Sequence, residues 1–306
     1  MTARQVVGVD IGGTKIAAAT VTAGGEPGPL LVTATPAAAG GEAVLDAVAA
    51  LVRQASPGTD LDGVGVGTGG VVDHTTGVVL SATDLIRNWA GCEVAAGLGR
   101  RLSLPVAGDN DGNTTALGER WYGAGRGLDD VLYVAVGTGI GGALTIGGTL
   151  IRGTHHTAGE LGHLPVADGT GVICSCGELD HLETVASGPA IAAAYGSSAD
   201  LREIAAWADT GDGRAAAVID AGARSLGRGL AGLANVIDPQ AVVLNGGVAA
   251  LGESYRKRVE ESMRSHCLPG PAEGVQVRLG QLGQYAAVLG AASLLLDPET
   301  ATIGAR

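Results

Sequence analysis

Residues 5–21, QVVGVDIGGTKIAAATV, contain two short apolar runs on either side of a glycine-containing turn. The runs at 5–10 and 16–21 have the length and the β-branched content of strands, and IGGT is a turn sequence, so the stretch predicts a β-hairpin. Residues 131–146, VLYVAVGTGIGGALTI, repeat this design without repeating the sequence. We therefore expect two structural units, each containing a hairpin with a glycine-rich tip.

Strands and helices alternate along the rest of the chain. Apolar residues recur at helical spacing over 41–55 and, most clearly, over 213–237, with Pro239 just past the end. Further helices are expected near 92–102, 112–121, 252–266 and 285–296, and further strands at 63–68 and 241–247. This alternation predicts an α/β protein. The domain boundary is expected near 116, where the second hairpin unit begins.

The composition indicates a folded, soluble chain. Of the 306 residues, 46% are hydrophobic and 16% charged, and the formal net charge is −12. A net negative charge argues against nucleic acid as a partner, although backbone N–H groups can still hold small phosphorylated ligands. The N-terminus lacks the pattern of a signal peptide, and YAAVLGAASLLL near the C-terminus is too short to span a bilayer. We expect a cytoplasmic protein with no membrane partner.

Two stretches match the glycine pattern of dinucleotide-binding loops, GxGxxG. They comprise Gly65, Gly67 and Gly70, and Gly137, Gly139 and Gly142. Neither is followed by the helix that a dinucleotide site needs, because β-branched, strand-like sequence comes after both. A nicotinamide-dependent dehydrogenase is therefore disfavoured, and no P-loop sequence is present.

The glycine-rich hairpin tips at 10–15 and 137–142 are suited to binding phosphate. Glycine lets consecutive N–H groups converge on an anion without a Cβ in the way. Asp10, beside the first tip, is placed to hold Mg²⁺ directly or through water. The alternative is that both tips are ordinary glycine turns and that Asp10 is a turn residue.

Six motifs in order resemble the ROK family of sugar kinases and sugar-responsive repressors, within the actin/hexokinase-like ATPases. DIGGTK (10–15) and GTGIGGA (137–143) resemble its phosphate motifs, and GDNDGN (108–113) resembles its catalytic segment. AGELGH (158–163) is similar to its sugar-binding segment, CSCGELDHLE (174–183) to its zinc signature, and LNGGV (244–248) to its adenosine-side turn. The resemblance implies a two-domain actin/hexokinase-like (ribonuclease H-like) fold with an interdomain cleft, residues 1–116 and 287–306 forming one domain and 117–286 the other.

The resemblance also assigns roles to individual residues. It makes Asp111 the catalytic base, although Asp is also a good helix N-cap residue, which is the alternative for this position. It implies sugar contacts from Gly70, Asn110, Asp111, Glu160, His163 and Glu183. It implies nucleotide contacts from Asp10, Gly12, Gly13, Thr14, Lys15, Gly137, Thr138, Gly139, Gly141, Gly142, Asn245, Gly246 and Gly247.

One wall of the sugar pocket departs from the family pattern. Where the family has an Asn before a Gly-Trp pair, ATDLIRNW (82–89) offers Asp84 and carries Asn88 in place of Gly. This departure puts that sugar contact in doubt and could alter which sugar fits. The adjacent residues His155 and His156 cannot easily share a ligand face, so we interpret them as exposed loop histidines.

The cysteine segment is a poor match to redox motifs, which favour CxxC at a helix start. Zinc needs four ligands, and Cys174 and Cys176 supply two. His163 and His181 would complete a Cys2His2 set. The family usually has Cys at position 181 and Gly at 180, but imidazole replaces thiolate readily and Asp180 tolerates left-handed turn geometry. The alternative is a loop with two free thiols.

These features predict an ATP-dependent sugar kinase that phosphorylates the 6-hydroxyl of a hexose, with ATP, Mg²⁺ and structural Zn²⁺. Glucose leads by analogy, and other hexoses and polyphosphate as donor stay open. A ROK repressor or a degenerate sugar-binding protein is the alternative. Repressors carry a winged-helix segment before the first hairpin, and Asp10 comes too early in the chain to leave room for one. By the same resemblance we expect a homodimer or homotetramer.

Overall fold

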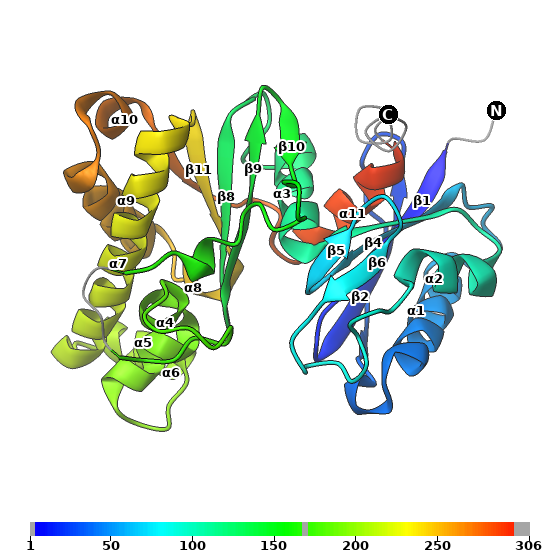
Figure 1. Ribbon diagram of the computed structural model, residues 1–306, viewed down its shortest axis with the longest axis horizontal. Coiled ribbons are helices and arrows are strands. Elements are labelled where there is room, and N and C mark those ends of the chain that lie inside the picture. The colour runs from blue at the N-terminus through cyan, green and yellow to red at the C-terminus, as the bar shows by residue number, and fades with distance from the viewer. Residues whose placement is uncertain (1–3, 167–170, 297–306) are drawn as a thin grey trace. The chain divides into compact units, whose positions relative to one another are not determined.

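The computed structural model describes residues 4–166 and 171–296 and divides into two compact units (Figure 1). Unit 1 comprises residues 1–126, 152–157 and 281–306, and unit 2 comprises 127–151 and 158–280. The expected boundary at 116/117 falls inside a helix, Asp111–Tyr122, and the compact units divide after Arg126. We propose these two units as the domains.

Unit 1 is built on a five-stranded mixed sheet in the order β3-β2-β1-β4-β7. The first hairpin, β1 and β2, is antiparallel, and β4 and β7 add to it in parallel. The strand bounds are β1 Gln5–Ile11, β2 Lys15–Thr22, β3 Leu31–Ala34, β4 Gly63–Thr68 and β7 Val106–Asn110. A separate two-stranded ribbon pairs β5, Val71–Asp73, with β6, Val78–Ser81.

Helices cover both faces of this sheet. The inward-facing residues Val7, Val9 and Ile11 pack with the apolar face of α1, whereas Val6 lies on the opposite face with α11. This alternation follows from the two-residue period of a strand. The helices are α1 Gly41–Ala55, α2 Val94–Leu102, α3 Asp111–Tyr122 and α11 Ala286–Leu296, with short 3₁₀ turns at Ala37–Ala39 and Gly283–Tyr285.

Glycines allow α11 to lie against the sheet and against α3 at backbone contact. A Cβ at Gly65 would sit 1.8 Å from the carbonyl oxygen of Ala291, and one at Gly290 would sit 1.6 Å from that of Thr114. Gly65 belongs to one of the two GxGxxG stretches for which a dinucleotide-binding role is disfavoured. Its role is to permit close packing between strand and helix.

Unit 2 repeats the sheet topology of unit 1 in the order β10-β9-β8-β11-β12. The second hairpin, β8 and β9, is antiparallel, and β11 and β12 add in parallel beside β8. Its strands are β8 Val131–Val136, β9 Ile140–Ile146, β10 Thr149–Ile151, β11 Ala241–Asn245 and β12 Gln276–Leu279. The repeated topology confirms the expected actin/hexokinase-like α/β fold.

The helices of unit 2 form one core with its sheet. Leu226 and Leu230 of α7 pack with Val259 and Met263 of α9 and with the buried strand residues. The helices are α4 Glu183–Ala186, α5 Gly188–Tyr195, α6 Leu201–Asp209, α7 Gly213–Ile237, α8 Gly246–Ala249, α9 Glu253–His266 and α10 Pro269–Gly274, with a 3₁₀ turn at Leu161–His163.

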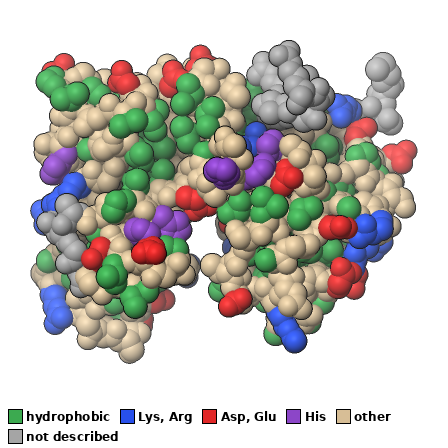
Figure 2. All heavy atoms as spheres, in the orientation of Figure 1, with side chains coloured by type: hydrophobic (Ala, Val, Ile, Leu, Met, Phe, Trp, Pro, Cys, Tyr) green, Lys and Arg blue, Asp and Glu red, His purple; other side chains and the backbone are tan. Residues whose placement is uncertain are grey.

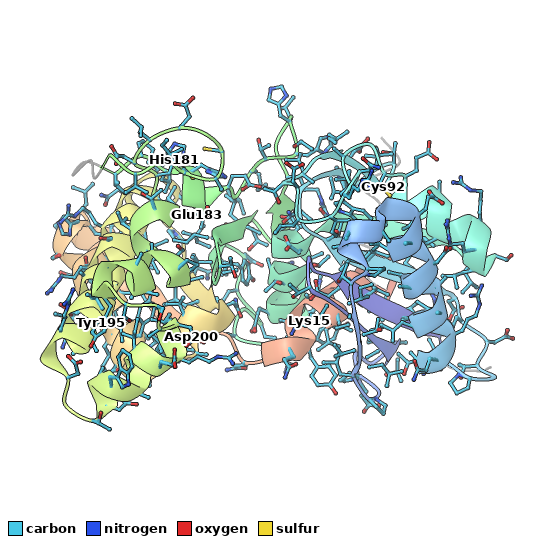
Figure 3. The ribbon with its side chains drawn as sticks, turned by 90° about the horizontal axis from the view of Figure 1, so that it is seen from below. Lys15, Cys92, His181, Glu183, Tyr195 and Asp200 are labelled. Carbon is cyan, nitrogen blue, oxygen red and sulfur yellow. The ribbon has the colours of Figure 1, made fainter. Side chains whose placement is uncertain are left out.

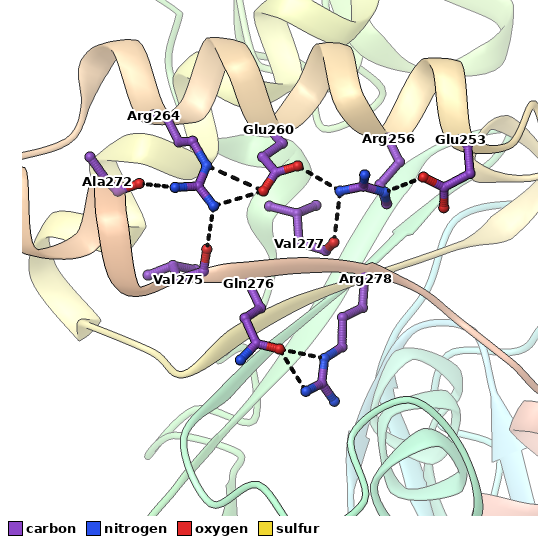
Figure 4. Close-up of polar contacts among 9 residues, drawn as sticks. All are labelled: Glu253, Arg256, Glu260, Arg264, Ala272, Val275, Gln276, Val277 and Arg278. Atoms are coloured by element: carbon purple, nitrogen blue, oxygen red, sulfur yellow. Dashed lines mark hydrogen bonds and ion pairs between the residues drawn. The ribbon is translucent and has the colours of Figure 1, made fainter.

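A charged network fixes α9 to the segment that leads into β12 (Figure 4). Glu260 accepts from Arg256 on one side and from Arg264 on the other, at 2.6 and 2.8 Å. Arg256 also donates to the carbonyl of Val277, and Arg264 donates to that of Ala272. Both guanidinium groups thereby satisfy main-chain acceptors while they remain paired.

Most elements lie where the sequence predicts them, and one prediction needs correction. The helices at 41–55 and 213–237 and the strand at 63–68 have the predicted bounds. The strand predicted over 241–247 ends at Asn245, and residues 246 and 247 begin the short helix α8. Gly246 has φ +91°, a conformation that turns the chain out of the strand direction.

The described part of the chain has no membrane-spanning helix, and the face shown in Figure 2 carries no broad basic area. None of the described helices is long and apolar enough to cross a membrane. On the face shown in Figure 2, Lys and Arg side chains form small separate groups among Asp and Glu. This distribution matches the net negative charge of the sequence.

Candidate active site and metal centre

The first hairpin tip is a tight turn held by main-chain contacts. The Gly12 N–H donates to the Lys15 carbonyl at 3.0 Å, and Thr35 Oγ1 donates to the Gly12 carbonyl at 2.7 Å. Thr14 accepts from the Thr35 N–H at 3.0 Å. Figure 3 labels Lys15, which is exposed, just after this tip. The tip is therefore fixed from behind, and its glycines are left to meet a ligand.

Asp10, one residue before the end of β1, carries a strongly perturbed carboxyl group. Burial and the nearby charge of Asp111 raise its pKa to about 6, against the opposing effect of Lys15. Two carboxylates in one electrostatic neighbourhood disfavour each other's ionised form. Such a pair is suited to a divalent cation, which would relieve the repulsion.

Asp111 stands at the first position of α3, directly after β7. The preceding residue, Asn110, is the N-cap, and its side-chain oxygen accepts from the N–H groups of Gly112 and Asn113 at 2.8 and 3.2 Å. The N-cap of α3 is therefore Asn110 and not Asp111. The surrounding protein removes part of the hydration of the Asp111 carboxyl group and so raises its pKa. The residue still has solvent-exposed surface, and its carboxylate accepts from the Gly112 N–H.

Asp111 lines a pocket of about 120 Å³ in unit 1. Gly70 lies in the same pocket with φ +101°, and its carbonyl accepts from the Asn110 side chain at 2.9 Å. A Cβ at Gly70 would lie 2.5 Å from the Ser81 carbonyl oxygen, so only glycine fits here. The structure therefore brings Gly70, Asn110 and Asp111 together.

The departure from the family pattern at 82–89 lies on the wall of this pocket. Leu85 and Trp89 line it, and the indole N–H of Trp89 donates to Thr68 Oγ1 at 3.1 Å. Asp84 is exposed and is not among the described residues that line the pocket. Asn88 has φ +54°, which explains why Asn can stand where the family has Gly.

The segment Arg152–Thr157 adds a contact that sequence reasoning missed. Arg152 Nε and Nη2 donate to Asp109 Oδ2 at 2.8 and 2.7 Å, and both side chains are buried. Asp109 Oδ1 accepts from Asn113 Nδ2 at 2.8 Å. This ion pair holds the junction of β7 and α3 that presents Asp111. No local signal in the sequence marks Arg152, because the contact is purely tertiary.

The same segment corrects the interpretation of its two histidines. His155 is exposed, as expected for a loop residue. His156 is partly buried, with 22% of its side chain exposed, and its ring lies 5.5 Å from that of His74. Its backbone has φ +59°, and this turn directs the adjacent side chains differently.

The second hairpin tip, residues 137–142, combines open and packed glycines. A Cβ at Gly137 or Gly141 would meet no described atom within 4 Å, whereas one at Gly142 would lie 2.5 Å from the Tyr133 carbonyl oxygen. The Gly137 N–H donates to the Gly139 carbonyl at 2.9 Å, which closes the turn around Thr138. Gly137 and Gly141 therefore leave backbone accessible, and Gly142 serves packing.

The third glycine turn, Asn245-Gly246-Gly247, contains an unpaired buried donor. Asn245 Nδ2 is inaccessible to solvent and has no hydrogen-bond partner among the described residues. Gly246 packs so closely on Val136 that a Cβ would lie 2.3 Å from its carbonyl oxygen, whereas Gly247 borders open space. A buried donor without an acceptor is costly, so the position suits a ligand acceptor such as a nucleotide.

The ring of His163 faces two different groups. Its Nδ1 lies 3.5 Å from Cys174 Sγ, and its Nε2 lies 3.9 Å from Glu160 Oε2. A histidine placed in this way can bind a metal ion through one ring nitrogen and contact a different group through the other.

Glu183, at the start of α4, links the cysteine segment to the second hairpin tip. Its Oε2 accepts from the Ile140 N–H at 2.9 Å, and its Oε1 accepts from Ser175 Oγ at 2.8 Å. Figure 3 labels Glu183 and His181 in this part of unit 2. Glu183 is therefore held in one orientation by two separate elements.

His163, Cys174, Cys176 and His181 form a cluster with the composition of a zinc site. One ligand atom from each lies within 4.8 Å of the other three, and His181 Nδ1 is 3.2 Å from Cys176 Sγ. Asp180 has φ +58°, the left-handed conformation predicted for it, which turns His181 back toward the thiols. Two thiolates and two imidazoles fit tetrahedral Zn²⁺.

The predicted site residues are divided between the two units. Unit 1 carries the first hairpin tip, Gly70, Asn110 and Asp111, and unit 2 carries the other two glycine turns, Glu160, Glu183 and the zinc cluster.

Comparison with known proteins gives consistent matches over nearly the whole chain. The profile described as "ROK family" matches residues 6–298. A glucokinase of Halalkalibacterium halodurans is 33% identical, with 98% of this chain and 97% of the relative covered. A putative xylose repressor of a Caldicellulosiruptor species is 30% identical over 77% of this chain and 62% of its own length.

The structural comparison agrees with the sequence comparison. The crystal structure of a ROK family glucokinase from Streptomyces griseus, in complex with glucose and AMPPNP, matches with a TM-score of 0.83 and 37% identity. The match covers 95% of this chain and 98% of that one. Kinases and regulators with the same fold are therefore both relatives of this protein.

Proposed function

The chain belongs to the ROK family, and from this premise we propose that it is an ATP-dependent hexokinase that phosphorylates the 6-hydroxyl of a hexose, with glucose as the leading substrate. The observation that carries the proposal is Asp111, whose carboxylate has a raised pKa and lines a pocket next to Asn110 and Gly70. A regulator needs to bind sugar but has no need of a base at this position.

Asp111 would accept the proton of the sugar hydroxyl as the phosphorus–oxygen bond forms. Burial raises the pKa of the Asp111 carboxyl group, and a raised pKa makes its carboxylate a stronger base. The Gly112 N–H holds one of its oxygens at 2.9 Å, so the other is available to the hydroxyl. The buried pair Arg152–Asp109 positions the start of α3 and thereby the direction in which Asp111 points.

Asp10 and the glycine turns fit a magnesium–nucleotide. A buried carboxyl group with a pKa near 6 gains from a nearby divalent cation, and Asp10 would hold Mg²⁺ directly or through water. The tip residues Gly12 to Lys15 and Gly137 to Gly142 would donate N–H groups to phosphate oxygens. Bound Mg²⁺–ATP supplies the phosphoryl group and neutralises the charge that develops on it.

Asn245 and the glycines beside it would bind the nucleoside side of ATP. The unpaired Nδ2 of Asn245 supports this assignment, because a ligand acceptor would satisfy it. The open space beside Gly247 leaves room for the approach of a ligand. Polyphosphate would not need this turn, so the unpaired donor favours ATP over polyphosphate.

Glu160, His163 and Glu183 would bind sugar hydroxyl groups from unit 2. A carboxylate accepts from a hydroxyl, and an imidazole nitrogen can accept or donate according to its tautomer. The proximity of His163 to Cys174 on one side and to Glu160 on the other supports a fixed tautomer. In this proposal Zn²⁺ is structural and orients the wall that carries these residues.

The proposal is tested by coupled ADP release across a panel of hexoses with ATP or polyphosphate as the donor. Turnover with glucose and ATP is expected, and Asp111→Asn should lower kcat by about 10²–10⁴. Asp60→Asn removes an exposed carboxylate of the same unit and should keep wild-type activity. Sugar binding without turnover on any hexose would instead support a regulator or a degenerate kinase.

The remaining features of the proposal are a homodimer or homotetramer and a cytoplasmic location. Oligomeric state is measured by light scattering of the purified chain in the presence and absence of glucose. A monomer under both conditions would contradict that part of the proposal without affecting the proposed chemistry.

A further inference from the structure

Asp73, His74 and His156 form a second cluster of metal-ligating side chains, in unit 1. Asp73 ends β5, His74 follows it in the β5–β6 turn, and His156 comes from the segment Arg152–Thr157. One ligand atom of each lies within 4.8 Å of the other two. The cluster contains no residue proposed above for sugar, nucleotide or zinc.

The two imidazoles in this cluster have unused ring nitrogens. The Nδ1 atoms of His74 and His156 are buried and make no hydrogen bond to any described residue. His156 Nε2 lies 4.0 Å from Asp73 Oδ1, which is too far for a hydrogen bond. The rings lie 5.5 Å apart at an angle of 60°, so they are not stacked on each other.

The carboxylate of Asp73 is already oriented by its neighbours. The N–H and the hydroxyl of Thr75 donate to Oδ1 at 2.9 and 2.7 Å, and the hydroxyl of Thr76 donates to Oδ2 at 2.8 Å. These hydrogen bonds fix the direction of the carboxylate and leave a lone pair of Oδ2 for an ion.

His156 is held in the cluster by a backbone conformation that non-glycine residues rarely adopt. Its φ is +59°, and its N–H donates to the Gly153 carbonyl at 3.3 Å. The segment is anchored at its start by the buried pair of Arg152 with Asp109. An imidazole held in a left-handed turn beside a second imidazole and a carboxylate is typical of a functional constraint.

The charges around the cluster favour a divalent cation. The positive charge of Arg152, which acts on His74, is balanced by Asp109, whose Oδ2 accepts from both Nε and Nη2 of Arg152. Two neutral imidazoles and the Asp73 carboxylate then leave one net negative charge for the ion. Imidazole and carboxylate together suit zinc, cobalt, nickel, iron and manganese rather than calcium.

We propose that Asp73, His74 and His156 bind a divalent first-row transition metal ion, with water completing its coordination. The ion would join the β5–β6 turn to the segment Arg152–Thr157. It would thereby hold Arg152 against Asp109, two residues before Asp111. The site is distinct from the zinc cluster, because it lies in unit 1 and contains no thiol.

Cobalt distinguishes the two sites, because thiolate ligands give Co²⁺ an intense charge-transfer absorption that imidazole and carboxylate ligands do not. The full-length chain is loaded with one equivalent of Zn²⁺, dialysed, and titrated with Co²⁺ while the metal content is measured. We expect one further equivalent of Co²⁺ to bind with d–d absorption but without the thiolate band. A thiolate band from the added Co²⁺, or no added binding, would overturn the proposal.

Variants of adjacent residues provide a matched comparison. His156→Asn retains a residue that tolerates positive φ and should lose the cobalt site, as should His74→Gln. His155→Ala removes the neighbouring exposed histidine and should bind Co²⁺ as the wild type does. Circular dichroism and melting temperature without metal identify any variant that fails to fold. Equal cobalt binding by folded His156→Asn, folded His74→Gln and the wild type would refute the assignment.

Discussion

Replacing Asp10 by Asn should stabilise the protein while it abolishes the proposed kinase activity. Asp10 is partly buried, one residue before the end of β1. Its pKa of about 6 means that the folded state resists ionisation of this carboxyl group. Asn has nearly the same shape and carries no charge, so it removes that cost.

The magnitude follows from the pKa and from its ordinary value. A carboxyl group with a pKa of about 6 when folded and 3.8 when unfolded differs by about 2 pH units. At about 1.4 kcal/mol per unit, ionised Asp10 lowers the free energy of unfolding by about 3 kcal/mol. The loss begins as pH rises above 3.8 and is complete above pH 6, because the folded state binds the extra proton in this interval.

The gain from Asp10→Asn should therefore depend on pH. We expect about 3 kcal/mol at pH 8, about half of that at pH 5 and about 0.5 kcal/mol near pH 4. Asp111→Asn should also stabilise the protein, because burial raises the pKa of Asp111 itself and the charge of Asp111 contributes to the raised pKa of Asp10. ATP with Mg²⁺ should stabilise the wild type more than it stabilises Asp10→Asn.

Tryptophan fluorescence can report unit 1 alone during unfolding in urea. Trp89 and Trp121 belong to unit 1, and Trp207, which belongs to unit 2, can be replaced by Phe in every variant. Asp60→Asn is the control, since it removes an exposed carboxylate and should change stability little at either pH. A gain for Asp10→Asn that is absent at pH 8, or equal at pH 5 and pH 8, would refute the reasoning.

Three further predictions concern the scaffold. Arg152→Met should lower the free energy of unfolding, measured in urea, by about 3–5 kcal/mol, because it leaves Asp109 buried without its partner. Adding Asp109→Asn should recover part of this loss. If the effects of the two substitutions simply add in the double variant, the pairing is contradicted. Cys176→Ala should lower the zinc content of the purified protein by elemental analysis, whereas Cys92→Ala, which lies outside the cluster, should not. Gly290→Ala should lower the free energy of unfolding, measured by thermal unfolding, by at least about 3 kcal/mol, because the added Cβ would lie 1.6 Å from a backbone oxygen. If this variant is as stable as the wild type, α11 can move away from the contact.

The sequence predicted those elements whose local signals agree with their tertiary surroundings. The helix at 213–237 has a continuous apolar stripe, and Asp212 caps it by accepting from Arg214 and Ala215. The bounds of this helix can therefore be predicted from the sequence alone. The end of β11 was misjudged because glycine after a strand can extend it, turn it or begin a helix, and the contact of Gly246 with Val136 decides among these.

The candidate site was predictable where a motif is continuous in the chain and not where contacts join distant segments. Asn110 and Asp111 lie side by side in sequence, and their capping and pocket positions follow from one junction of strand and helix. Arg152 and His156 lie in a segment without periodicity. Their partners, Asp109 and Asp73, are known only once the chain is folded.

The cysteine segment shows how a proposed structural metal can influence the proposed sugar site without taking part in chemistry. Ser175, between the two cysteines, donates to Glu183 Oε1, and the other oxygen of Glu183 accepts from the N–H of Ile140 in the second hairpin tip. A zinc ion on Cys174 and His163 would fix the loop that carries Ser175. The orientation of Glu183 would then depend on the metal through one hydrogen bond, while its link to Ile140 would persist. Zinc removal is therefore expected to weaken sugar binding more than nucleotide binding.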